Sequence, residues 1–120
     1  MPKTEVVIYA EQDGASPLLD WMDRIPNKAQ DKCFVKIERL SEMGHELRRP
    51  EADFLRDGIY ELRATNRRIH YRILYFFSEG VAVLSHGLIK EQSVPPKEID
   101  LAIQRKKRFS GDPSQYTYRE

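Results

Sequence analysis

Basic side chains that could bind a phosphate gather in the middle of the sequence. Arg68, His70 and Arg72 follow one another at intervals of two residues, and Arg63 precedes them by five positions. Because successive side chains point to opposite faces of a β-strand, residues two apart share a face. A guanidinium group stays charged and can bind two phosphate oxygens, while an imidazole exchanges protons near neutral pH. The spacing therefore predicts a basic surface suited to phosphate chemistry.

The residues around these side chains predict three consecutive strands. β-Branched and aromatic residues stand between turn-forming Asn, Ser and Gly, which is the usual signal of strands joined by hairpins. We expect strands over 59–64, 67–77 and 81–86, with a turn at Thr65-Asn66 between the first two. Ile69 and Tyr71 then share the face opposite the basic side chains, and that face should pack on a core.

Helices are expected on both sides of this segment. After a first strand over 4–10, Ser16 and Pro17 predict the start of a helix over 16–25, because serine caps helices and proline suits their first position. Further helices are expected over 28–43, ending at Gly44, and over 97–109. Residues 45–57 and 90–94 should be loops, and residues from about 111 a frayed tail.

This order of elements belongs to the α+β class. It predicts one domain over residues 1–120, with a small antiparallel-rich sheet, two N-terminal helices on one face and a C-terminal helix. The 120 residues are 40% hydrophobic, which suffices for a core. The single cysteine, Cys33, fits a reducing cytoplasm, and no apolar run is long enough to span a membrane. No Cys/His cluster has zinc-ligand spacing, and neither a metal nor a cofactor is expected.

The net charge of +1 conceals an asymmetry between the two halves of the chain. Residues 1–57 contain nine Lys and Arg against twelve Asp and Glu, whereas residues 58–120 contain eleven against seven. A basic half suits a polyanionic partner such as a nucleic acid.

Several short motifs occur together in that half. They are Asp57-Gly58, Tyr-x-x-Arg from Tyr60, Arg-Ile-x-Tyr-Arg from Arg68, Leu-x-His-Gly-x-x-Lys from Leu84 and Pro-x-x-Glu from Pro95. With these motifs, residues 55–109 resemble the RelE/ParE superfamily of type II toxins, and most closely its HigB-like, phage-associated branch. The two upstream helices agree with this resemblance in order and length.

The resemblance implies a ribosome-dependent endoribonuclease (an mRNA interferase) that cuts mRNA through the 2′-hydroxyl without a metal. It also implies a partner antitoxin, expected to be a small helix-turn-helix DNA-binding protein. The catalytic residues expected are Arg63, Arg68, Arg72, His86 and Lys90. RNA contacts are expected at Arg67, His70, Glu91, Arg105, Lys106 and Lys107. Tyr116 or Tyr118 could replace the C-terminal tyrosine used by some members.

Such a reaction needs a base for the 2′-hydroxyl, cationic donors for the phosphorane and an acid for the leaving oxygen. The arginines can supply the donors. The candidate bases are His70, His86, Glu61 and Glu91, and the candidate acids are Lys90 and the histidines. The sequence alone leaves the two proton-transfer roles unassigned among these residues.

Other interpretations remain open at this point. The superfamily includes gyrase poisons, so the chain could be a non-catalytic topoisomerase poison, a phage protein that binds a host factor, or an inactive RNA-binding module. The arginines could also be the solvated side of a half-buried sheet. The basic run 105–108 could simply complement the C-terminal dipole of a helix.

Overall fold

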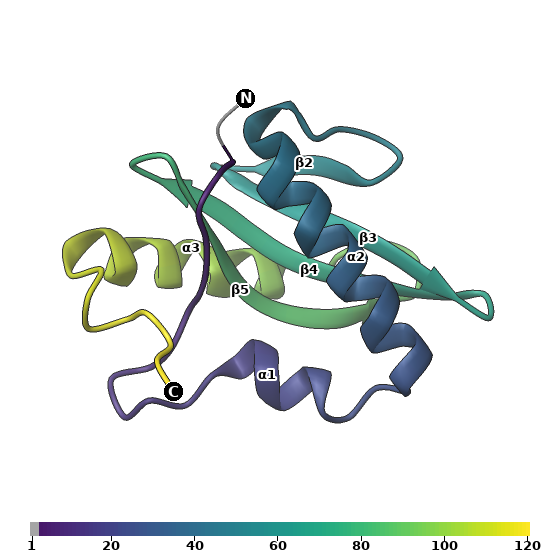
Figure 1. Cartoon of the computed structure of the whole chain (residues 1–120), viewed down its shortest axis with the longest axis horizontal. Helices are drawn as coiled ribbons and strands as arrows, with labels where there is room; N and C mark the ends of the chain where they lie inside the picture. The colour runs from purple at the N-terminus through teal and green to yellow at the C-terminus, as the bar shows by residue number, and fades with distance from the viewer. Residues whose placement is uncertain (1–2) are drawn as a thin grey trace.

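A five-stranded mixed sheet lies at the centre of the protein (Figure 1). The computed structural model describes residues 3–120. The strands lie in the order β1-β5-β4-β3-β2, and only β1 (Val6–Ile8) and β5 (Val81–Lys90) pair in parallel. The antiparallel part consists of β2 (Ala52–Arg56), β3 (Ile59–Asn66), β4 (Ile69–Ser78) and β5. The expected antiparallel-rich sheet is therefore confirmed.

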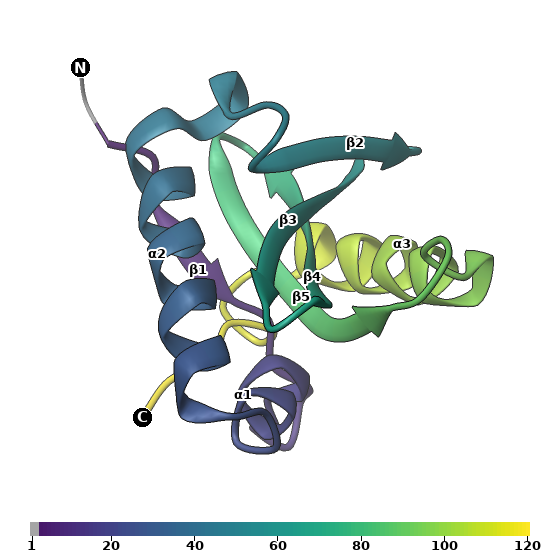
Figure 2. The ribbon, with the colours of Figure 1, turned by 90° about the vertical axis from the view of Figure 1, so that its right-hand side faces the viewer.

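Helices cover both faces of this sheet (Figure 2). α1 (Pro17–Met22) and α2 (Asn27–Met43) pack on one face, over a core that includes Leu62, Tyr71, Ile73 and Leu84. α3 (Pro96–Gly111) packs on the other, over Ile59, Leu74, Phe76 and Val83. The α+β class and the placement of the early helices are confirmed. Arg72 and Leu74 share a face of β4, so the sheet face that carries the basic side chains is apolar where α3 covers it. Across residues 3–120, no helix has the length and apolar content needed to cross a membrane.

The helix ends follow the sequence signals closely. The Ser16 hydroxyl accepts a hydrogen bond from the Leu19 backbone N–H at 3.2 Å, and Pro17 is the first residue of α1, as predicted. α2 begins at Asn27, one residue before the predicted start at Lys28. Gly44 ends α2 with a positive φ of 56° and opens a short 3-10 helix, η1 (Gly44–Glu46).

The segment 45–57, expected to be a loop, contains η1 and the edge strand β2. Ala52 lies opposite Leu62, and Phe54 lies opposite Tyr60. Ala52 is fully buried, but Phe54 remains 51% exposed, so only part of the apolar side of this strand is covered. Buried and exposed side chains therefore alternate only weakly along β2. This explains why the sequence pattern did not predict a strand here.

All three antiparallel hairpins close with two-residue turns. The turns are Asp57-Gly58, Arg67-Arg68 and Glu79-Gly80. Every one of these residues has a positive φ, which is the signature of type I′ turns. The turn predicted at Thr65-Asn66 is therefore wrong by two residues, since both belong to β3. Arg67 and Arg68 lie in the turn, not on a strand.

The C-terminal residues are held against β1, contrary to the expected frayed tail. The Ala10 N–H donates to the Tyr116 carbonyl at 2.9 Å, and the Tyr118 N–H donates to the Ile8 carbonyl at 2.7 Å. The ring of Tyr116 also stacks on that of Tyr9, with centroids 5.8 Å apart. The outer edge of β1 would otherwise leave backbone groups without partners, and the tail supplies them. Figure 1 shows the C-terminus beside the first strand.

Candidate functional site

The register of three strands brings basic side chains into rows on one sheet face. Arg63 lies opposite Arg72, and in the next row Thr65, His70 and Lys90 lie opposite one another. Directly paired residues of neighbouring strands share a face. Arg63, His70 and Arg72 therefore lie on one face, as their spacing predicts; Lys90 joins them there, whereas Arg68, also expected on this face, lies in the turn.

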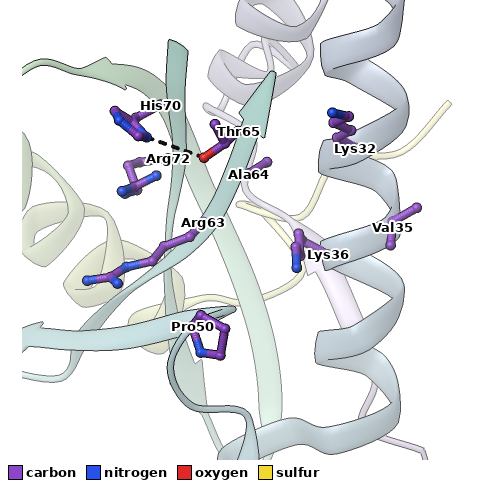
Figure 3. A pocket seen from close by; sticks show the side chains of 9 residues that line it. All are labelled: Lys32, Val35, Lys36, Pro50, Arg63, Ala64, Thr65, His70 and Arg72. Carbon is purple, nitrogen blue, oxygen red and sulfur yellow. Dashed lines mark hydrogen bonds between the residues drawn. The ribbon is translucent and has the colours of Figure 1, made fainter. Parts of the chain in front are cut away.

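A cleft of about 510 Å³ opens beside the free edge of β3 (Figure 3). The pairing of β2 with β3 ends at Leu62, and the last bond between the segments joins the Arg63 N–H to the Glu51 carbonyl at 2.8 Å. Beyond this point α2 flanks the edge of β3, and it contributes Lys32 and Lys36 to the cleft. The strands contribute Arg63, Thr65, His70 and Arg72. Cationic groups thus line the cleft on both sides.

A buried carboxylate holds the two arginines of the cleft. The Glu61 side chain is only 2% exposed, and its Oε2 accepts a hydrogen bond from Arg63 Nε at 3.0 Å. Its Oε1 lies 3.2 Å from Arg72 Nε, in ion-pair contact without hydrogen-bond alignment. Arg72 also donates from Nη1 to the Tyr71 carbonyl at 3.0 Å. Burial lowers the pKa of the Arg72 guanidinium, and the charge of Glu61 opposes this shift. Glu61 therefore offsets the buried charge of Arg72.

A second carboxylate extends this network towards the surface. Asp53 Oδ2 accepts from Arg63 Nη2 at 3.3 Å and pairs with Arg49 at 2.7 Å. The hydrogen bond from Arg49 is the main cause of the lowered pKa of Asp53. Lys36 pairs with Glu51 at 3.3 Å. Of the basic side chains that line the cleft, Lys32 and His70 have no carboxylate within ion-pair distance in residues 3–120.

His70 is the only imidazole in the cleft. Its side chain is exposed, and Nδ1 lies 3.3 Å from the Thr65 hydroxyl oxygen. Figure 3 shows this contact beside Arg72. The group that can exchange protons therefore lies next to the cationic donors.

His86 belongs to a different, buried network under α3. Its Nδ1 lies 2.8 Å from the Ser85 hydroxyl oxygen, and its Nε2 lies 3.0 Å from Glu98 Oε1. Burial, and then the charge of Arg105, lower the pKa of His86, so the neutral imidazole is favoured at pH 7. Arg105 is itself buried there, with its guanidinium 5.4 Å from the centre of the Tyr9 ring. Neither residue lines the cleft, so His86 lies apart from Arg63 and Arg72, and Arg105 is buried, unlike the rest of the basic run 105–108.

The remaining predicted residues also lie outside the cleft lining. Lys106 and Lys107 are on α3, and Glu91 is exposed in the segment after β5. Arg67 and Arg68 occupy the β3–β4 turn. The sequence interpretation missed Lys32 and Lys36, although both flank the buried stripe of α2 four residues apart. Only the packing of α2 beside β3 shows that they line the same cleft as the arginines.

Comparison with known families places most of the chain in one of them. Residues 20–107 match the sequence model of the family described as phage derived protein Gp49-like (DUF891). This range contains the second half of α1, all of α2, all strands except β1, and every residue that lines the cleft. The comparison with curated proteins gave no match.

Proposed function

Because the chain belongs to the phage-derived Gp49-like family, which is toxin-like in general, we propose that it is the toxin of a type II toxin–antitoxin system, of the HigB-like branch. The activity that we propose is ribosome-dependent cleavage of mRNA. The observation that carries this proposal is the cleft itself, in which Arg63 and Arg72, held by Glu61, lie beside the exposed imidazole of His70.

The chemistry is displacement at phosphorus by the neighbouring 2′-hydroxyl. The 2′-oxygen loses its proton and bonds to phosphorus, the bond to the 5′-oxygen breaks, and a 2′,3′-cyclic phosphate remains. Arg63 and Arg72 stabilise the charge that develops on the phosphorane oxygens, and their forked donors suit this geometry. Lys32 and Lys36 attract the RNA backbone from the opposite side of the cleft.

We assign proton transfer to His70 and Lys90, which form the row of the sheet next to Arg63 and Arg72. His70 accepts the proton of the 2′-hydroxyl, because it is exposed and lies next to Arg72 on the same strand face. Lys90 lies opposite His70 on β5, next to the cleft lining, and we assign to it the proton for the leaving 5′-oxygen. His86 takes no part, since Ser85 and Glu98 already occupy both of its ring nitrogens.

The proposal includes three partners. The mRNA and the ribosome are the substrate and its carrier, and a small helix-turn-helix antitoxin blocks the toxin in the cytoplasm. An antitoxin that covers the cleft should present acidic residues to it, since Lys32 and the arginines repel a basic surface.

The test is a purified translation system programmed with one mRNA. Adding the protein should produce new mRNA 5′ ends inside codons, and Arg72→Ala should remove them. Arg119→Ala is the matched control, because this exposed arginine lies in the tail beside β1, at the far edge of the sheet. Intact mRNA together with inhibition of DNA gyrase would refute the proposal and favour the topoisomerase poison.

A further inference from the structure

The turn nearest the cleft differs from the other two at one position. Asp57-Gly58 and Glu79-Gly80 have glycine as the second residue, with φ near 80°, whereas Arg68 holds that position with φ of 69°. This left-handed conformation brings Cβ close to the backbone, so glycine is strongly preferred there. An arginine in this position is unfavourable for the backbone, and the same chain twice uses the favourable residue.

Neither arginine of this turn has a partner that would explain its presence. Both are exposed, and no carboxylate or other acceptor in residues 3–120 lies within bonding distance of either guanidinium. By contrast, the arginines at the cleft, Arg63 and Arg72, are both paired. The turn therefore presents two charges that the fold does not use.

These charges continue the basic rows of the cleft. His70 and Arg72 are two residues apart on β4, which is about 6.6 Å along the strand, and the Arg67-Arg68 turn directly precedes this strand. Lys90 widens the middle row from the neighbouring strand. Successive phosphates of an extended RNA strand lie at a comparable spacing. The β3–β4 hairpin thus carries basic side chains from the cleft to its tip.

We propose that the Arg67-Arg68 turn binds a backbone phosphate of an RNA strand whose cleavable phosphate lies in the cleft. This proposal rests on the proposed function and specifies its substrate as an extended single strand along the β3–β4 hairpin, reaching beyond a single phosphate. The unfavourable backbone of the turn is retained because arginine, unlike glycine, can hold the RNA.

The decisive variant is Arg67→Asn/Arg68→Gly, which installs a preferred type I′ pair. It should raise the melting temperature by about 3–6 °C, since the turn becomes favourable. It should also lower the affinity for an eight-nucleotide single-stranded RNA at least tenfold. The slope of log affinity against log salt should become shallower by about 0.7 for each phosphate that the variant no longer neutralises. A dinucleotide, whose single phosphate reaches only the cleft, should bind the variant and the parent protein equally.

Two control variants separate turn geometry from charge. Glu79→Asn improves another turn, and it should raise the melting temperature without weakening RNA binding. Arg24→Asn/Arg119→Asn removes two exposed arginines that lie outside the cleft, and it should leave the affinity for the eight-nucleotide RNA within about twofold. Co-sedimentation with mRNA-free ribosomes distinguishes the source of the phosphate. A binding loss there but not with the oligomer would assign the turn to ribosomal RNA and overturn the inference.

The outcomes distinguish this inference from the proposed function. If the turn variant keeps its affinity for both the oligomer and ribosomes while the parent protein cleaves mRNA, the inference is wrong and the function stands. A fall in the melting temperature of the variant would show that the arginines serve the fold, which also overturns the inference. A parent protein that binds neither RNA nor ribosomes refutes both.

Discussion

Replacing Glu61 by glutamine removes a charge from beneath the cleft arginines while keeping the shape of the side chain. Removing one member of a buried ion pair typically costs about 3–5 kcal/mol, because the other charge stays buried. Arg72 is 7% exposed and keeps only the Tyr71 carbonyl, whereas Arg63 is 25% exposed and keeps Asp53. Glutamine also retains one acceptor oxygen. We therefore expect Glu61→Gln to lower the free energy of unfolding by about 3 kcal/mol, the lower end of that range.

Glu61→Gln should also lower the rate of mRNA cleavage by more than the loss of folded protein explains. Without the carboxylate, the guanidinium of Arg72 is no longer held against the cleft wall, and a displacement of about 1 Å can cost about a hundredfold in rate. Urea denaturation gives the stability, and cleavage of ribosome-bound mRNA is measured at a temperature where the variant remains folded.

A double-mutant cycle isolates the interaction between Glu61 and Arg72. Arg72→Met fills a similar volume without a charge, so Glu61→Gln/Arg72→Met should be more stable than Glu61→Gln alone. The coupling free energy should be about 1–3 kcal/mol. If Glu61→Gln costs less than about 0.5 kcal/mol and shows no coupling to Arg72, the carboxylate does not hold the arginine and our account of the cleft is wrong.

Three further predictions concern other parts of the fold. Arg72→Lys should reduce the rate of mRNA cleavage about a hundredfold with little change in substrate binding, because an ammonium cannot replace the forked donor; single-turnover kinetics checks this. The pKa of His86 is lowered in the folded state, so the unfolded chain binds more protons at mildly acidic pH. The free energy of unfolding should therefore fall as the pH drops below about 6.5. Chemical denaturation from pH 7.5 to 5.5 should show a smaller fall for His86→Asn than for the parent protein. Gly87→Ala should lower stability by about 1–3 kcal/mol, since a Cβ there would overlap the Trp21 ring, and an unchanged melting temperature would contradict this close approach.

The basic face could be predicted because an error of two residues leaves strand parity unchanged. The sequence places the β3–β4 turn at Thr65-Asn66, since Asn and Thr form turns more readily than Arg. The true turn lies two residues later, at Arg67-Arg68. Side chains alternate with a period of two, so His70 and Arg72 remain on the predicted face, whereas a shift of one residue would have moved both to the other.

Other parts of the site depend on contacts that are distant in the sequence. Nothing local shows that α2 lies beside the open edge of β3, so Lys32 and Lys36 could not be assigned to the cleft. The His-Gly dipeptide resembled a catalytic motif, but in the structure its histidine packs towards α3 and its glycine makes room for Trp21 of α1. Each residue of that dipeptide serves a different layer of the fold.

The open edge of β3 has a consequence for how copies of the protein meet. At the opposite side of the sheet the C-terminal tail shields β1, so the stretch of β3 beyond Leu62, which β2 does not pair, is where another chain could extend the sheet. A second copy that paired there edge to edge would bring its own Lys32 and Arg63 against those of the first. These like charges would repel one another across the contact, and salt screens the repulsion. The cations of the cleft therefore also keep the molecules apart, and concentrated solutions should remain monodisperse at low ionic strength and begin to self-associate as salt is added.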